Sequence, residues 1–282
     1  MAGISILFVI NTIEMNMINF LQYSFIQKAF FAGSFIGIIC AALGMFLVLR
    51  KMSLIGDGLS HVSFGAIALG LFFGVYPFYV AVPVVVAGSY LILKITEKAK
   101  VYGDAAIGIV SAVGISGGII LAGVSRGFNV DLFSYLFGNI LSISNLEVVL
   151  SVLLSCVVLA ILYFYYWDLF SATFDEEYAK TTGIKTSKIN TILIFLTALT
   201  VVLSVKMVGV MLVSALLILP AACALQIAKG FKFAIILGCI ISLVSVLLGI
   251  TFSFFLDLPA GATIVMMNAI FFALAFIYKR IA

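Results

Sequence analysis

Long apolar runs constrain this chain more than any other feature of its sequence. Of its 282 residues, 65% are hydrophobic and 9% are charged, and the mean hydropathy is +1.35. An ordinary soluble domain has about 25% charged residues. The runs approach the roughly 20 residues that an α-helix needs to cross a bilayer, and they lack the alternation of a membrane β-barrel. We therefore predict an all-α, polytopic membrane protein whose residues 1–282 form one transmembrane domain surrounded by lipid.

Polar breaks divide the chain into about nine predicted spans. Residues 1–19 precede them and are expected either to lie at the interface or to add a short helix. They lack a basic start, and Glu14 stands where a cleavage site would be expected, so we do not predict a cleaved signal peptide. The piece 132–138 is too short to span and is predicted as a re-entrant or surface helix. The spans fall at about 29–49, 57–73, 78–93, 105–122, 146–167 and 191–205, then a seventh that follows Gly209 and ends near 225, an eighth that ends near 255, and 263–277.

The lysine and arginine residues predict the orientation of the spans. Cytoplasmic loops of membrane proteins carry an excess of these two residues. With nine spans, 3 of the 15 fall on one side, and they are Lys28, Arg126 and Lys206. The N-terminus is therefore predicted outside and the C-terminus in the cytoplasm. The other side, predicted cytoplasmic, holds Arg50, Lys51, Lys94, Lys98, Lys100, Lys180, Lys185, Lys188, Lys229, Lys232, Lys279 and Arg280.

Several function classes lack their motifs in this chain. The net charge of +4 is explained by the cytoplasmic loops and does not indicate nucleic-acid binding. No Walker motif is present, so any ATP hydrolysis needs another polypeptide. A membrane metallopeptidase would need two histidines and a glutamate, and the chain has one histidine. The cysteines lie in apolar runs without close spacing and are expected to be small core residues: Cys40, Cys156, Cys223 and Cys239.

The only histidine, His61, follows Asp57 by four residues, at the start of the second predicted span. On a helix this spacing puts both side chains on one face. Ionisable groups inside a membrane usually have a function, and a carboxylate with an imidazole is a common ligand pair for a divalent transition metal. The alternative is structural. Asp57 would then be the N-cap of a helix that starts near Gly58, and His61 would be a hydrogen-bonding group.

The most polar stretch of the chain, about 168–190, separates the fifth and sixth predicted spans. Within it, residues 174–183 predict a short cytoplasmic helix, because three acids at its start suit the helix dipole and a glycine suits its end. This helix is either a solvated connector or a docking element for a soluble partner. Its members are Phe174, Asp175, Glu176, Glu177, Tyr178, Ala179 and Gly183, with Lys180 to Thr182 between them.

Five motifs together resemble the permease subunits of bacterial zinc and manganese ABC importers. The resemblance covers most of the chain. The more specific motifs are RKMSLIGDGLSH at 50–61, at the start of the second span, and FDEEYA with GI at 174–184. The shorter ones follow the family order: LFG at 136–138, LPAA at 219–222 and LPAGA at 258–262.

The resemblance implies a fold like that of the vitamin B12 importer permease, in the bacterial cytoplasmic membrane. It implies a permease homodimer, two cytoplasmic ATPase subunits that use ATP, and an extracytoplasmic metal-binding protein. Asp57 and His61 become ligands of the transported ion, and 174–183 becomes the coupling segment to the ATPase. No permanently bound cofactor is implied, and the chain itself is not an enzyme. Asp131 and Asp257 fall in outer turns, where they would lie close to the docked binding protein.

The alternatives concern the energy source and the substrate. A proton-coupled secondary metal carrier could use Asp57 and His61 as a proton relay, but it would need neither a docking helix nor an ATPase. A siderophore or cobalamin permease has the same implied fold but does not need this pair. Among metals, zinc is favoured and manganese comes next, because the sequence of residues 56–63, GDGLSHVS, is more similar to that of zinc permeases than to that of manganese permeases.

Overall fold

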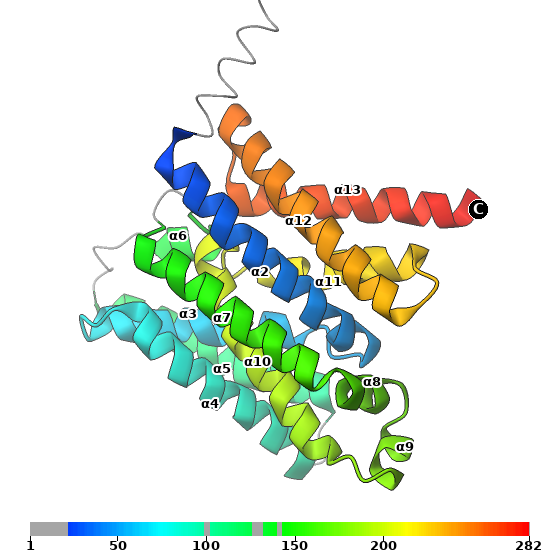
Figure 1. The fold of residues 1–282 in the computed structure, drawn as a ribbon. Coiled ribbons are helices and arrows are strands. Elements are labelled where there is room, and N and C mark those ends of the chain that lie inside the picture. The colour runs from blue at the N-terminus through cyan, green and yellow to red at the C-terminus, as the bar shows by residue number, and fades with distance from the viewer. Residues whose placement is uncertain (1–21, 99–101, 126–131, 140–142, 282) are drawn as a thin grey trace, which may run out of the picture.

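The protein is all-helical, as predicted. The computed structural model describes residues 22–98, 102–125, 132–139 and 143–281, and no strand occurs among them. Within these residues, eight helices are long and apolar enough to cross a membrane (Figure 1). They are α2 (Ser24–Leu49), α3 (Ile55–Phe72), α4 (Pro77–Lys98), α5 (Gly103–Val124), α7 (Asn145–Phe164), α10 (Thr186–Val208), α12 (Phe231–Leu256) and α13 (Ala260–Ile281).

Four shorter helices complete the described part of the chain, namely α6 (Leu132–Phe137), α8 (Tyr166–Phe174), α9 (Glu176–Thr181) and α11 (Val213–Ile227). Helix α11 stands where the seventh span is predicted, but it has 15 residues. At 1.5 Å per residue it is about 22 Å long, less than the roughly 30 Å of a bilayer core. Its position is close to the predicted one, but it is too short to count among the candidate spans, because α10 continues to Val208 and Gly209, with a φ of 90°, separates the two helices.

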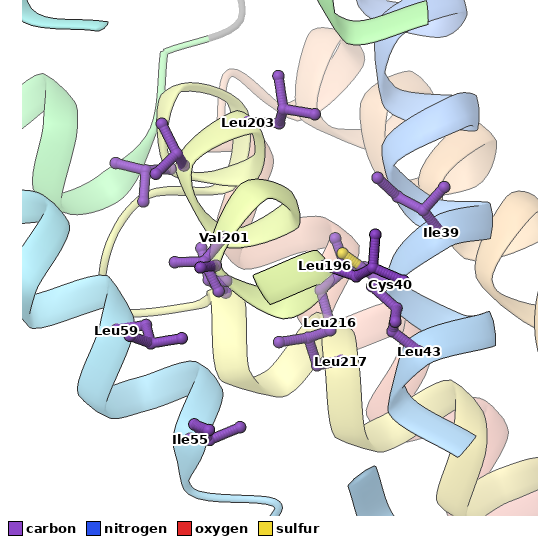
Figure 2. Packing of buried hydrophobic residues seen from close by; sticks show 14 of the residues in the cluster. Ile39, Cys40, Leu43, Ile55, Leu59, Leu196, Val201, Leu203, Leu216 and Leu217 are labelled. Atoms are coloured by element: carbon purple, nitrogen blue, oxygen red, sulfur yellow. The ribbon is translucent and has the colours of Figure 1, made fainter. Parts of the chain in front are cut away.

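The core lies between α2, α3, α10 and α11. Figure 2 shows Ile39 and Leu43 of α2, Leu59 of α3, Leu196 of α10 and Leu217 of α11 converging there. All of these side chains are buried. By contrast, α5 and α7 are largely exposed along their apolar length, as expected of helices that face lipid. The short helix α11 is therefore a central element, although it does not match the bilayer in length.

Glycines let helix backbones touch at the main crossings. A Cβ on Gly44 of α2 would collide with the Leu217 carbonyl of α11, and one on Gly65 of α3 would collide with the Gly114 carbonyl of α5. Small residues allow this close approach, which is a principal way for helices to associate in lipid. These contacts join α2 to α11 and α3 to α5.

A second glycine junction joins α6, the end of α10 and the start of α13. The backbone N–H of Val210 donates to the Tyr135 carbonyl at 3.0 Å, and that of Asn139 donates to the Lys206 carbonyl at 3.1 Å. A Cβ on Gly209 would lie 2.5 Å from the Gly138 nitrogen, and one on Gly261 would collide with the Val208 carbonyl. The short helix α6 is thus tied to the end of α10 by main-chain hydrogen bonds.

We expect Gly209→Ala to destabilise the protein. Its backbone, at φ 90° and ψ 156°, is in a region that essentially only glycine adopts, which costs about 1–3 kcal/mol for other residues. The added methyl would also collide with the end of α6. Thermal unfolding of the detergent-solubilised protein should occur at a clearly lower temperature. Gly108→Ala is the matched control, because a Cβ there meets nothing within 4 Å. Equal midpoints for the two variants would contradict this account of the junction.

Candidate metal site and coupling segment

Asp57 lies inside the first turn of α3 and is not its N-cap. The helix begins at Ile55, three residues earlier than Gly58, and Leu54 occupies the N-cap position without a side-chain cap bond. The capping alternative for Asp57 is therefore wrong. A carboxylate in the first turn still interacts favourably with the positive end of the helix dipole.

Asp57 and His61 come together as their spacing predicts. The His61 Nε2 atom lies 3.7 Å from Asp57 Oδ2. Two donors that are each about 2.1 Å from one ion, at a tetrahedral angle, are about 3.4 Å apart. A small side-chain movement is therefore enough for the pair to hold one ion. The Asp57 side chain is 45% exposed and that of His61 is 18% exposed, so the carboxylate is the more accessible of the two groups.

The two residues form only part of a coordination sphere. In the part of the chain that the structure describes, no three histidine, cysteine, aspartate or glutamate residues are close enough to hold a metal together. The other imidazole nitrogen, His61 Nδ1, is buried and has no hydrogen-bond partner among the described residues. A structural zinc site is normally closed by four protein ligands. Asp57 and His61 instead form an open pair.

Neighbouring helices hold α3 closely around this pair. A Cβ on Gly58 would lie 2.5 Å from the Ile107 side chain of α5, and one on Gly56 would lie 2.6 Å from that of Leu217 on α11. A Cβ on Gly114 would lie 2.7 Å from the Val62 Cα atom and 3.1 Å from the His61 carbonyl oxygen. The candidate ligands therefore lie on a helix that has little freedom to slide or rotate within this conformation.

The predicted helix over 174–183 is in fact an elbow between two helices. Phe174 ends α8, and Asp175 is the N-cap of α9, its carboxylate accepting from the Tyr178 N–H at 2.9 Å. The prediction of one helix from Phe174 was therefore too long at its start, because the aspartate caps a new helix there. Its end was right. Gly183 has φ 88°, and Ile184 N–H donates to the Ala179 carbonyl at 3.0 Å, in a Schellman motif.

Only some members of the predicted coupling segment are exposed. Tyr178 is 62% exposed, and Glu177 is exposed beside it. Ala179, also a member of the predicted coupling segment, is fully buried against the core. Phe174 is largely exposed at its edge, but its ring also packs 5.5 Å from that of Phe231 on α12. Ala179 therefore anchors the segment to the permease, and Tyr178 and Glu177 face outward.

Arg50 ties the segment to the rest of the bundle, and the sequence indicated only its side of the membrane. It follows α2 as the C-cap, and its Nε–H donates to Thr173 Oγ1 of α8 at 3.1 Å. A second guanidinium N–H donates to Asn190 Oδ1 of α10. Burial lowers the pKa of Arg50, and the Glu176 carboxylate opposes that shift. Arg50 thus connects α8, α9 and α10 to the short connector that leads into α3.

The sequence also did not reveal the partner of Lys206. Its ammonium lies 2.5 Å from Glu147 Oε1, at the N-terminus of α7. Tyr76 donates to the same carboxylate, and Ser144 forms a capping box with it. Burial and the Glu147 carboxylate both raise the pKa of Tyr76, so its phenol remains a donor. A lysine on the sparsely charged side of the predicted topology is therefore neutralised by a local partner.

The remaining predicted residues are structural or lie outside the described part of the chain. Asp257 is the C-cap of α12 in a left-handed conformation, as expected of a turn residue. Asp131 and residues 1–19 lie outside the described residues. None of the four cysteines forms a disulfide, and the Cys40 thiol lies 3.4 Å from the Ser204 hydroxyl inside the core.

The fold and the Asp57–His61 pair together define a polytopic helical membrane protein with a candidate ion site. A family model described as the ABC 3 transport family matches residues 22–279. The chain therefore belongs to this family, and the resemblance drawn from its motifs is confirmed.

Relatives of known name support the same class. The chain is 34% identical to the manganese transport system membrane protein MntC of Halalkalibacterium halodurans, over 92% of this chain and 89% of that protein. It is 33% identical to the high-affinity zinc uptake system membrane protein ZnuB of Haemophilus influenzae, over 92% and 99%. The solved structure of PsaBC from Streptococcus pneumoniae in complex with Fab aligns with a TM-score of 0.84 at 32% identity, over 93% of this chain and 95% of that one.

We expect Gly114→Ala to disturb the α3–α5 crossing that positions Asp57 and His61. The new methyl would press on the Val62 backbone, and overpacking of this kind costs about 1–3 kcal/mol. The midpoint of thermal unfolding should fall by several degrees. Gly117→Ala, one turn further along the same helix, meets open space and should unfold no earlier than the wild type. If Gly114→Ala is as stable as Gly117→Ala, backbone contact at this crossing does not fix α3.

Proposed function

We propose that this chain is the permease subunit of an ATP-driven importer of a divalent transition-metal ion in the bacterial cytoplasmic membrane. The observation that carries the proposal is the open Asp57–His61 pair, held at 3.7 Å inside a polytopic helical bundle. Membership of the ABC 3 transport family supports the ATP-driven class. The proposed subunit does not catalyse a reaction, and a separate ATPase subunit hydrolyses ATP.

We propose zinc as the preferred ion and manganese as the next. One oxygen donor and one nitrogen donor suit both ions, and affinity order alone does not set selectivity in cells. The preference for zinc comes from the sequence of residues 56–63, GDGLSHVS, which is more similar to that of zinc permeases. The relatives bear names of both kinds: MntC is a manganese transport protein and ZnuB a zinc uptake protein.

The proposed assembly contains two copies of this chain, two cytoplasmic ATPase subunits and an extracytoplasmic metal-binding protein. In it, residues 1–282 act as one permease domain, with the N-terminus outside, the C-terminus in the cytoplasm and the coupling segment at about 168–190. This orientation needs nine crossings, so the short helix α11 is counted as one of them. The excess of lysine and arginine on one side then supports the orientation. The second copy supplies further ligands to the ion, because each chain contributes only an open pair.

The proposed mechanism uses the pair as a temporary stop for the ion. The binding protein releases the ion into the outward-open dimer, where Asp57 and His61 replace part of its water shell. Binding must be modest, since an ion that is held too tightly cannot leave. Closure of the ATPase dimer would then displace α9, and Arg50 would pass this movement from α8 to the connector before α3.

Two alternatives have less support. A secondary carrier would not belong to an ABC family or need the exposed α8–α9 segment. A siderophore or cobalamin permease shares the proposed architecture but gives no reason for a carboxylate and an imidazole on one face of α3. Uptake of radioactive zinc and manganese into cells, each measured against the other as competitor, discriminates the ions and the alternatives.

We expect His61→Ala to lower metal uptake by at least about 10- to 100-fold, because even outer-shell partners of metal ligands have effects of this size. Asp57→Asn should also lower uptake, since it keeps the shape of the side chain but removes its charge. Both variants should reach the membrane in normal amounts. Ser63→Ala serves as the control on the same helix, because its buried hydroxyl has no partner in the described part of the chain. Wild-type uptake by His61→Ala would exclude the ligand role.

We expect Tyr178→Asp to uncouple the permease from its ATPase. Tyr178 is exposed on α9, so the change adds a charge to the proposed contact without disturbing the permease core. The ATPase should no longer copurify, or it should hydrolyse ATP without moving metal. Tyr102→Asp is the matched control, because this exposed tyrosine lies in the 94–104 turn on the same predicted side. If Tyr102→Asp uncouples and Tyr178→Asp does not, the coupling surface is that turn.

A further inference from the structure

An apolar groove of about 680 Å³ opens on the bundle surface where α2, α7, α8 and α12 meet. Its deep wall consists of Phe46, Leu159, Leu162 and Ile235. These residues belong to the last turns of α2 and α7 and the first turns of α12, next to α8 (Figure 1). The groove therefore runs from the level of the membrane interface into the apolar part of the bundle.

Aromatic rings and one lysine form the rim of this groove. The Lys232 ammonium lies 4.9 Å from the centre of the Trp167 ring and 5.8 Å from that of Tyr166. Trp167 is 64% exposed. Asp168 follows Trp167 on α8, yet among the described residues no carboxylate lies within 4.0 Å of Lys232. The rim thus presents a cation that no acidic side chain neutralises.

We infer that this groove binds an anionic phospholipid, with one acyl chain along Phe46, Leu159 and Ile235 and the phosphate at Lys232. A ligand for the site must be apolar over its length and negatively charged at one end. Basic positions between membrane helices bind anionic headgroups, and tryptophan and tyrosine prefer the headgroup level. The lysine stem can lie along the apolar wall while its ammonium reaches the phosphate.

The bound lipid would contact α8 and so stabilise the position of the coupling segment. Tyr166 and Trp167 of the rim belong to α8, and α8 leads directly to the Asp175 cap of α9. An acyl chain in the groove would fill the space between α8 and α12 and hold this elbow in place. This consequence rests on the proposed function, whereas lipid binding itself does not.

Trp167 makes the proposal directly measurable, because it is the only tryptophan of the chain. The full-length protein is reconstituted in bilayers that contain phosphatidylglycerol or phosphatidylcholine with brominated acyl chains, which quench nearby tryptophan. At equal mole fraction, the anionic lipid should bind about fivefold more tightly at the site, the contribution of one lysine near the membrane surface. Lys232→Gln should abolish this preference, and Lys232→Arg should retain it.

Lys229→Gln is the matched control, since it removes a lysine from the turn just before α12 but not from the groove. It should leave the preference unchanged. Equal quenching by the two lipids in the wild type would overturn the proposal, as would a preference that survives Lys232→Gln or is lost equally in Lys229→Gln. Absence of quenching by both lipids would mean that a protein surface covers Trp167, and would also overturn it.

Discussion

Backbone contact at glycines is the constraint on which the rest of this structure depends. Lipid tails are as apolar as leucine, so burial of apolar surface does not by itself bring two helices together in a bilayer. Close approach does, and Gly44, Gly65 and Gly114 provide it at the crossings of α2 with α11 and of α3 with α5. Because α3 carries Asp57 and His61, residues without any functional group determine where the candidate ligands lie.

Polar contacts at the ends of the bundle complement this apolar middle. At one end Arg50 joins α8 and α10, and at the other Glu147 joins Lys206 and Tyr76. The centre of the bundle is held by backbone contact and deforms little, because protein interiors are densely packed. Under the proposed function, a movement of α8 and α9 would therefore reach α3 through Arg50 and the connector 51–54, with little repacking of the core.

Hydropathy predicted the long spans well, because each apolar run must be a helix in lipid. Three features could not be predicted from hydropathy, since each depends on local geometry or on residues far apart in the chain. The aspartate at 175 begins a new helix where composition alone suggested one continuous helix. The sequence predicted Ala179 as a member of the coupling segment but could not show that it is buried. The partners of Arg50 lie 123 and 140 residues away, and that distance is invisible to any local pattern.

The proximity of Asp57 and His61 was predictable because the two candidate ligands lie one helical turn apart on the same helix. Under the proposed function, the incompleteness of the pair has a physical use. Four protein ligands would hold the ion as a structural zinc site does. In a two-fold symmetric dimer the same patch of each copy can meet at the axis. Two open pairs would then provide four donors when the copies are close and two when they separate. The affinity for the ion would then follow the spacing of the copies, and the proposed cytoplasmic ATPase dimer would act by changing that spacing.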